Sequence, residues 1–194
     1  MVYLEMENTL VSKFTIIACT LAIACLTTIG LAEVKSGLQV GDYVDAFDVK
    51  DCSSGIARGK TLCYRWVYGG RPVVAIFTRK LDDNLVSLTK KMQAKLYENS
   101  SKQLRCFVVY LTDEPAKHEE TLAALALKHR FRTLPLTVFD GNSGPKEIKL
   151  SPKAENTVLF WKDLEVKQNF AFEEGKMDAN AVENVVLGLN SILE

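Results

Sequence analysis

Cysteines are the residues of this 194-residue chain that are best suited to chemistry. Cys63 is followed three positions later by Trp66, where a second cysteine would complete a C-x-x-C pair. Arg65 lies close enough in sequence to stabilise a Cys63 thiolate and make it reactive. Cys52 precedes Cys63 by a short turn-like segment, and Cys106 lies within an apolar run. We expect Cys106 to be a small buried hydrophobe.

The elements around Cys63 have the pattern of a hairpin. Residues 46–51 and 61–68 have the composition of short strands, and the Ser- and Gly-containing segment between them is typical of a turn. In an alternating strand, positions 63 and 66 would face opposite sides, which argues against a reversible thiol pair there. The turn could instead bring Cys52 opposite Cys63. A structural Cys52–Cys63 disulfide would stabilise the domain by about 2 to 3 kcal/mol in the chain-entropy model, and two free thiols are the alternative.

Other catalytic or metal-binding patterns are missing from the sequence. His118 and His129 are the only histidines, and a helix would separate them by about 16 Å, too far to share one metal. The H-E-x-x-H, P-loop, dinucleotide-binding and Ser-His-Asp patterns are not found. We therefore predict no metal and no cofactor. The 24 basic and 24 acidic residues balance, which predicts no nucleic-acid partner.

The N-terminus indicates export. Residues 14–31 contain no charge and follow Lys13, as in a secretory signal peptide that is cut after Ala32. An uncleaved membrane anchor is the alternative, and either would leave the rest of the chain outside the membrane. We expect a secreted or periplasmic protein with a signal peptide over 1–32, a linker over 33–41 and one domain over 42–194. Disulfides are favoured in that compartment.

The rest of the chain alternates strands and helices. Apolar runs predict buried strands, and three- and four-residue apolar spacing predicts amphipathic helices. A strand, a helix and a strand in succession imply a parallel pair. Three helices would pack on one mixed α/β sheet. After the hairpin we expect strands at 72–78, 104–111, 134–141, 157–161 and 165–172, and helices over 85–96, from Asp113 to His129, and from Asp178 onward.

That order of elements resembles the thioredoxin fold. The segment "VGDYVDAFDVKD" (40–51) resembles the N-terminal part of redoxin and peroxiredoxin domains of the alkyl hydroperoxide reductase type. The segment "RTLPLTVFDG" (132–141) resembles the place where thioredoxin-like proteins carry a cis-proline, so Pro135 is expected to be cis. The resemblance covers about residues 38–194. It implies a thioredoxin-like mixed sheet with an N-terminal β-hairpin extension.

The family's active-site cysteines lie where the helix after the first buried strand begins. Here that segment is "TRKLDDNL" (78–85), which has no cysteine. Asp82 and Asp83 stand in its place, and carboxylates at a helix start cap the backbone without catalysis. The resemblance thus implies a redoxin-like domain that lacks the usual thiols.

Three functions remain open, of which the third is a purely structural role inside a larger envelope complex. In the first, the protein is a binding or scaffold domain whose Asp82, Asp83, Leu134 and Pro135 form one corner that contacts a protein or peptide. In the second, it is a thiol-disulfide oxidoreductase or peroxiredoxin-like antioxidant enzyme that uses Cys63 as nucleophile and Cys52 as resolving partner.

Overall fold

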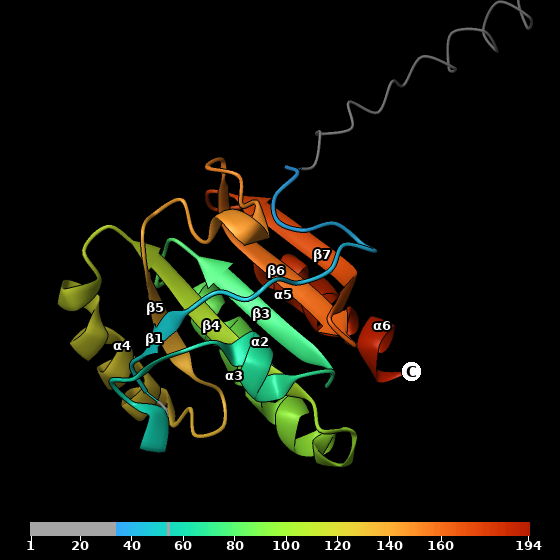
Figure 1. The fold of residues 1–194 in the computed structure, drawn as a ribbon, viewed down its shortest axis with the longest axis horizontal. Coiled ribbons are helices and arrows are strands. Elements are labelled where there is room, and N and C mark those ends of the chain that lie inside the picture. Colours follow the sequence, from blue (N-terminus) through green and yellow to red (C-terminus); the bar gives the residue numbers. More distant parts are fainter. Residues whose placement is uncertain (1–33, 54) are drawn as a thin grey trace, which may run out of the picture. The chain divides into compact units, whose positions relative to one another are not determined.

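The computed structural model describes residues 34–53 and 55–194, which belong to the second of two compact units, Glu33–Glu194 (Figure 1). The predicted signal peptide or anchor falls on residues outside the described part. Within the described part, no helix has the length and apolar character needed to cross a membrane.

The second unit is built on one seven-stranded mixed sheet with the order β2-β1-β5-β4-β3-β6-β7. β3, β4 and β5 are parallel, whereas β6 runs antiparallel to both β3 and β7. The expected mixed sheet is confirmed. The strands are β1 Val49–Asp51, β2 Thr61–Leu62, β3 Val73–Thr78, β4 Arg105–Thr112, β5 Leu136–Asp140, β6 Ala154–Lys162 and β7 Glu165–Glu173.

Helices cover the sheet on both faces. The α-helices are α2 Tyr64–Tyr68, α3 Asp83–Glu98, α4 Pro115–His129, α5 Ala179–Leu187 and α6 Asn190–Leu193, with 3-10 turns η1 Gly55–Ala57, η2 Ser100–Lys102 and η3 Lys146–Ile148. Every residue of β3 is buried, and its side chains alternate between two cores. One core lies under α3, α4 and α5. The other lies under α2 and the N-terminal segment, which cross the front of the sheet in Figure 1.

The prediction of one strand over residues 61–68 is wrong. β2 pairs with β1 only through two residues of each strand. The chain then turns into α2, where Tyr64 and Tyr68 lie one helical turn apart with ring centroids at 5.0 Å. Both rings also pack on Phe107 of β4. Burial of this aromatic pair against the sheet overrides the strand preference of the isolated segment.

The C-terminal helix begins as predicted but is interrupted. Asp178 accepts a hydrogen bond from Ala181 N at 2.8 Å and so caps α5. The helix ends at Leu187, and α6 begins only at Asn190. Gly188 lies between them, and a Cβ atom at this position would approach the Phe170 ring to 2.7 Å. The close passage of β7 therefore favours glycine where the two helices meet.

Candidate functional site

The junction between β3 and α3 is the place where the family resemblance puts its thiols. Asp82 is the N-cap of α3, and its Oδ1 accepts a hydrogen bond from Leu85 N at 2.9 Å. Asp83 follows in the first turn, where a negative charge is favoured by the helix dipole. The expectation that a carboxylate caps this helix is confirmed.

The start of β6 lies beside this junction. Thr78 at the end of β3 pairs with Asn156, and Arg79 N donates to Glu155 O at 3.0 Å. The Glu155 carboxylate is buried, lies 3.5 Å from Lys80 Nζ and accepts a hydrogen bond from Asn156 Nδ2. Arg79, Lys80 and Glu155 line a hollow of about 320 Å³. The junction is therefore a polar site built from two separate segments.

Hydrogen-bonding capacity remains unused at this junction. The Arg79 guanidinium donates to the carbonyl oxygens of Asn142 and Ala154, while burial lowers the pKa of the guanidinium. Arg79 Nη2 and Asn156 Oδ1 are buried and have no hydrogen-bond partner among the described residues. Sequence reasoning missed Glu155 and Asn156 because the strand was predicted to begin after them. Their polar character at the start of an apolar run was the available signal.

The predicted corner of Asp82, Asp83, Leu134 and Pro135 does not form. β4 lies between β3 and β5, so these two strands are about 10 Å apart. All three are parallel, and Leu134 and Pro135 precede β5 whereas Asp82 follows β3. The two halves of the predicted corner therefore lie at opposite ends of the parallel strands. The neighbour of the β3 end is the start of β6.

Pro135 also differs from its expected conformation. The described residues contain no cis peptide bond, so the Leu134–Pro135 bond is trans. The trans form is intrinsically favoured by about 0.5 to 1 kcal/mol for an X-Pro bond. Pro135 O accepts a hydrogen bond from Val108 N at 2.9 Å, which links the start of β5 to β4.

The predicted Cys52–Cys63 disulfide is not formed. Cys52, Cys63 and Cys106 are all free thiols. The hairpin pairs Val49 with Leu62, so Cys63 lies beyond one end of the ladder and Cys52 beyond the other. The offset amounts to about four residues, or about 13 Å of strand. The register therefore prevents the bridge.

Burial limits the chemistry of two of these thiols. Burial raises the pKa of the Cys52 thiol to about 12, and the side chain is only 4% exposed. Burial also raises the pKa of Cys106, which confirms its expected role as a buried hydrophobe. Because the thiolate is the reactive form, Cys52 is poorly suited to be a resolving partner. Cys63 is the partly exposed thiol of the described residues.

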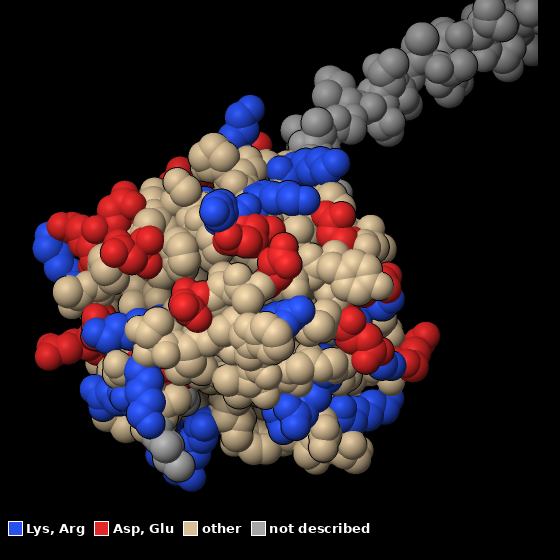
Figure 2. Space-filling model, viewed as in Figure 1, with Lys and Arg blue, Asp and Glu red and all other residues tan. Residues whose placement is uncertain are grey.

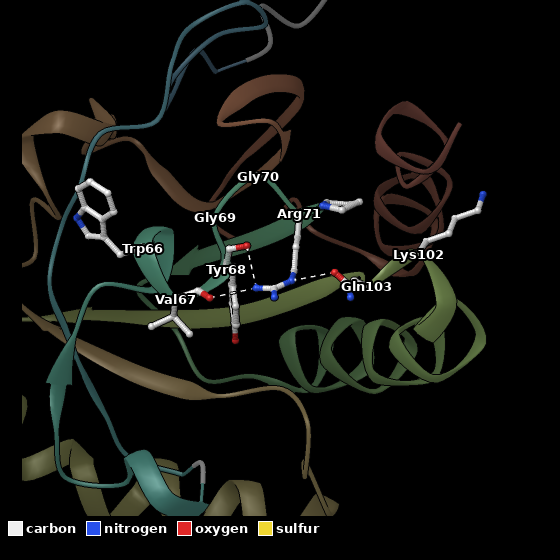
Figure 3. Close-up of a pocket in the computed structure, with 9 residues that line it drawn as sticks. Trp66, Val67, Tyr68, Gly69, Gly70, Arg71, Lys102 and Gln103 are labelled. Atoms are coloured by element: carbon white, nitrogen blue, oxygen red, sulfur yellow. Dashed lines mark hydrogen bonds between the residues drawn. The ribbon is translucent and has the colours of Figure 1, made fainter.

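Cys63 lies at the start of a helix instead of within a strand. It is the N-cap residue of α2, and Trp66 occupies the third helical position. Positions 63 and 66 lie within one helical turn and are therefore neighbours. In the strand that the sequence predicted, they would have faced opposite sides. Trp66 is 69% exposed, and the centroid of its ring lies 4.4 Å from the Arg65 guanidinium carbon. Figure 3 shows Trp66 pointing away from the neighbouring Arg71.

No group of three or more His, Cys, Asp or Glu side chains within the described ranges is arranged to hold a metal ion.

Comparison with solved structures identifies the fold. No protein-family model and no curated protein matches the chain. The peroxidoxin BcpB from Mycobacterium tuberculosis is similar, with a TM-score of 0.59, 18% identity, and coverage of 81% of this chain and 99% of that one. The chain has the thioredoxin-like redoxin fold.

Two further redoxin-fold structures are similar to the chain. A protein from Chlorobium tepidum, named as the thiol:disulfide interchange protein DsbE, has a TM-score of 0.53 and 12% identity, with coverage of 78% of this chain and 99% of that one. Peroxiredoxin Q from Xanthomonas campestris has a TM-score of 0.57 and 13% identity, with coverage of 82% and 99%. At these identities the likeness concerns the fold.

Proposed function

We propose that this protein is an exported redoxin-fold domain that binds a partner and does not carry out thiol chemistry at the β3–α3 junction. The observation that carries the proposal is that Asp82 caps α3 through Leu85 N. The segment 78–85 contains no cysteine. A carboxylate at this position can bind and cap but cannot form a sulfenic acid or a disulfide.

The positions of the other thiols support this proposal. The similar structures are named for peroxide reduction and disulfide interchange, and both reactions need a thiolate. In this chain Cys52 and Cys106 are buried, and burial raises the pKa of each. Neither can supply a thiolate readily near neutral pH.

One observation favours a second candidate function. Cys63 is partly exposed at the start of α2 and is close in sequence to Arg65. A lone thiol in this position could react with a peroxide or a disulfide. Its resolving thiol would then come from another molecule, because Cys52 is too distant in the hairpin register.

Enzyme assays separate the two functions. Insulin reduction and hydrogen peroxide consumption are measured for the wild-type protein and for Cys63→Ser. The binding function predicts that the two proteins have equal, background turnover. Turnover that depends on Cys63 would establish the enzyme in place of the binding domain.

The proposal includes export, which rests on the apolar residues 14–31 after Lys13. N-terminal sequencing of protein recovered outside the cytoplasm should begin at Glu33 if the leader is cleaved. Recovery in the membrane fraction with the leader intact would support the anchored alternative, and recovery from the cytoplasm alone would contradict export.

A further inference from the structure

Five arginines lie where the parallel strands begin, at the end of the sheet away from Asp82. They come from the turn after η1, from the segments that precede β3 and β5, and from the first residue of β4. Figure 2 shows Lys and Arg side chains gathered along the lower edge of the molecule, beneath the loops that enter these strands. This group, called the arginine edge, consists of Arg58, Arg71, Arg105, Arg130 and Arg132.

The charge of the arginine edge is not neutralised within the described residues. All ion pairs found there are made by lysines, and none involves these five arginines. The Arg71 guanidinium donates only to neutral acceptors, the carbonyls of Val67 and Tyr68 and the side chain of Gln103 (Figure 3). Arg105 donates to the carbonyl of the preceding residue. One edge of a protein with no net charge therefore carries five arginines that make no ion pair among the described residues.

Three hollows follow this edge in succession. The first, about 520 Å³, is lined by Arg71, and the second, about 420 Å³, by Arg105. These two share Tyr68 in their walls. The third, about 760 Å³, is lined by Arg130 and Arg132, and the residue after Arg132 belongs to the wall of the second. We call this series of neighbouring hollows the furrow.

Apolar surface is interleaved with these charges. Trp66 is 69% exposed at the first hollow, and Tyr97 is 55% exposed at the second. The third hollow has an aliphatic wall on α4 that includes Ala123, Ala124 and Leu127, of which Leu127 is 81% exposed. Large exposed apolar side chains beside cations are typical of binding surfaces.

We propose that this furrow binds an extended acidic peptide of a partner protein, in which carboxylates alternate with apolar side chains. Guanidinium groups bind carboxylates in a bidentate fashion, which provides the charge recognition. Alternate residues of an extended peptide point to opposite sides, so apolar side chains can enter the hollows while carboxylates meet the arginines. The inference rests on the proposed function, because it names the partner class of that binding domain.

A nucleic acid is less well matched to the same surface. Glu120 lines the widest hollow, and a nucleic acid carries a charged phosphate at every nucleotide, whereas an alternating peptide can place an apolar side chain beside this carboxylate. Single strands bind by stacking bases on aromatic rings. Exposed rings lie at the two smaller hollows, whereas the α4 wall of the widest hollow is aliphatic and its Phe131 is buried. The peptide class therefore accounts for both the charges and the lining.

The test measures the fluorescence anisotropy of a short labelled peptide in which Glu alternates with Leu. The variant is Arg130→Gln combined with Arg132→Gln, because neither guanidinium makes a hydrogen bond within the described residues and the fold should persist. Lys153→Gln is the control, since it removes an exposed charge at the opposite end of the sheet. Circular dichroism verifies that all three proteins are folded.

The wild type should bind the Glu–Leu peptide with an affinity that falls as salt is added. The double variant should bind about tenfold more weakly or worse, and Lys153→Gln should bind as the wild type does. Equal binding of a Lys–Leu peptide, preferential binding of oligothymidylate, no binding, or wild-type affinity in the double variant would overturn the proposal. These outcomes leave the insulin and peroxide assays unaffected, so the two proposals can fail separately.

Discussion

At the scale of single residues, the proposed binding function rests on Asp82, which lies where the redoxin resemblance expects a thiol. Its carboxylate accepts a hydrogen bond from Leu85 N and has a structural use at the start of α3. The same position in a redoxin active site would need a nucleophile. A helix start thus supports either a thiolate or a capping carboxylate by the same physics, because both are stabilised by free backbone N–H groups.

Replacement of Asp82 tests this structural role. Asp82→Ala removes the cap and should lower the free energy of unfolding by about 1 kcal/mol. Asp82→Asn keeps an acceptor oxygen and should cost a smaller amount. Urea denaturation of both variants provides the measurement. Equal stability of Asp82→Ala and the wild type would show that the cap contributes nothing.

A second residue-scale prediction concerns the buried contact between α2 and β1. The Tyr64 hydroxyl donates to Asp51 Oδ2, and both residues are buried. Tyr64→Phe removes this donor at a buried carboxylate and should destabilise the protein by about 1 to 3 kcal/mol. Tyr68→Phe is the matched control, since it keeps the ring but removes a hydroxyl that has no hydrogen bond within the described residues. Similar losses in both variants, measured by thermal unfolding, would contradict the assignment.

At the scale of elements, the helix α2 alters the geometry expected for the segment from Cys63 to Trp66. The segment lies at a helix start, where a cysteine at each end of C-x-x-C can form a disulfide within one turn. Trp66→Cys should therefore create a bridge with Cys63 on mild oxidation. Arg65→Cys is the control, because helical residues two positions apart do not face each other. Peptide mapping without reductant should find the bridge only in Trp66→Cys, and its absence there would contradict this account of α2.

At the scale of the whole molecule, the buried thiols predict how stability depends on pH. The ordinary pKa of the Cys52 thiol is 9.0, and burial raises it to about 12 in the folded protein. Between these values the unfolded chain loses the proton while the folded chain keeps it. The contribution of the Cys52 thiol to the free energy of unfolding is therefore complete below about pH 9 and declines as the pH rises toward 12. The decline is at most ~1.4 kcal/mol for each pH unit.

The comparison with Cys52→Ala isolates this contribution. Urea denaturation of both proteins in the presence of reductant should show a steeper decline for the wild type between pH 9 and about 12. Parallel declines would show that Cys52 ionises equally in the folded and unfolded states.

Much of the fold could be predicted from the sequence because its signals were local. The apolar run of β3, the apolar spacing of α3 and the caps at Asp82 and Asp178 each depend on neighbouring residues. α2 could not be predicted in this way, since Tyr64 and Tyr68 are helical only through their packing on Phe107 of a distant strand.

The candidate site was harder to predict because it depends on strand order. β5 follows α4 in sequence, yet the strand beside the β3 end is β6, and β4 separates β3 from β5. Pro135 was therefore placed at the wrong end of the sheet. The arginine edge likewise joins segments that are far apart in sequence, and the balanced total charge conceals it.

The most direct test of the account is to expose the folded wild-type protein to hydrogen peroxide and map sulfenic acid at each cysteine over time. We expect slow oxidation confined to Cys63, at the rate of an ordinary free thiol and without turnover when a reductant is supplied. Rapid oxidation of any cysteine together with catalytic turnover would contradict it.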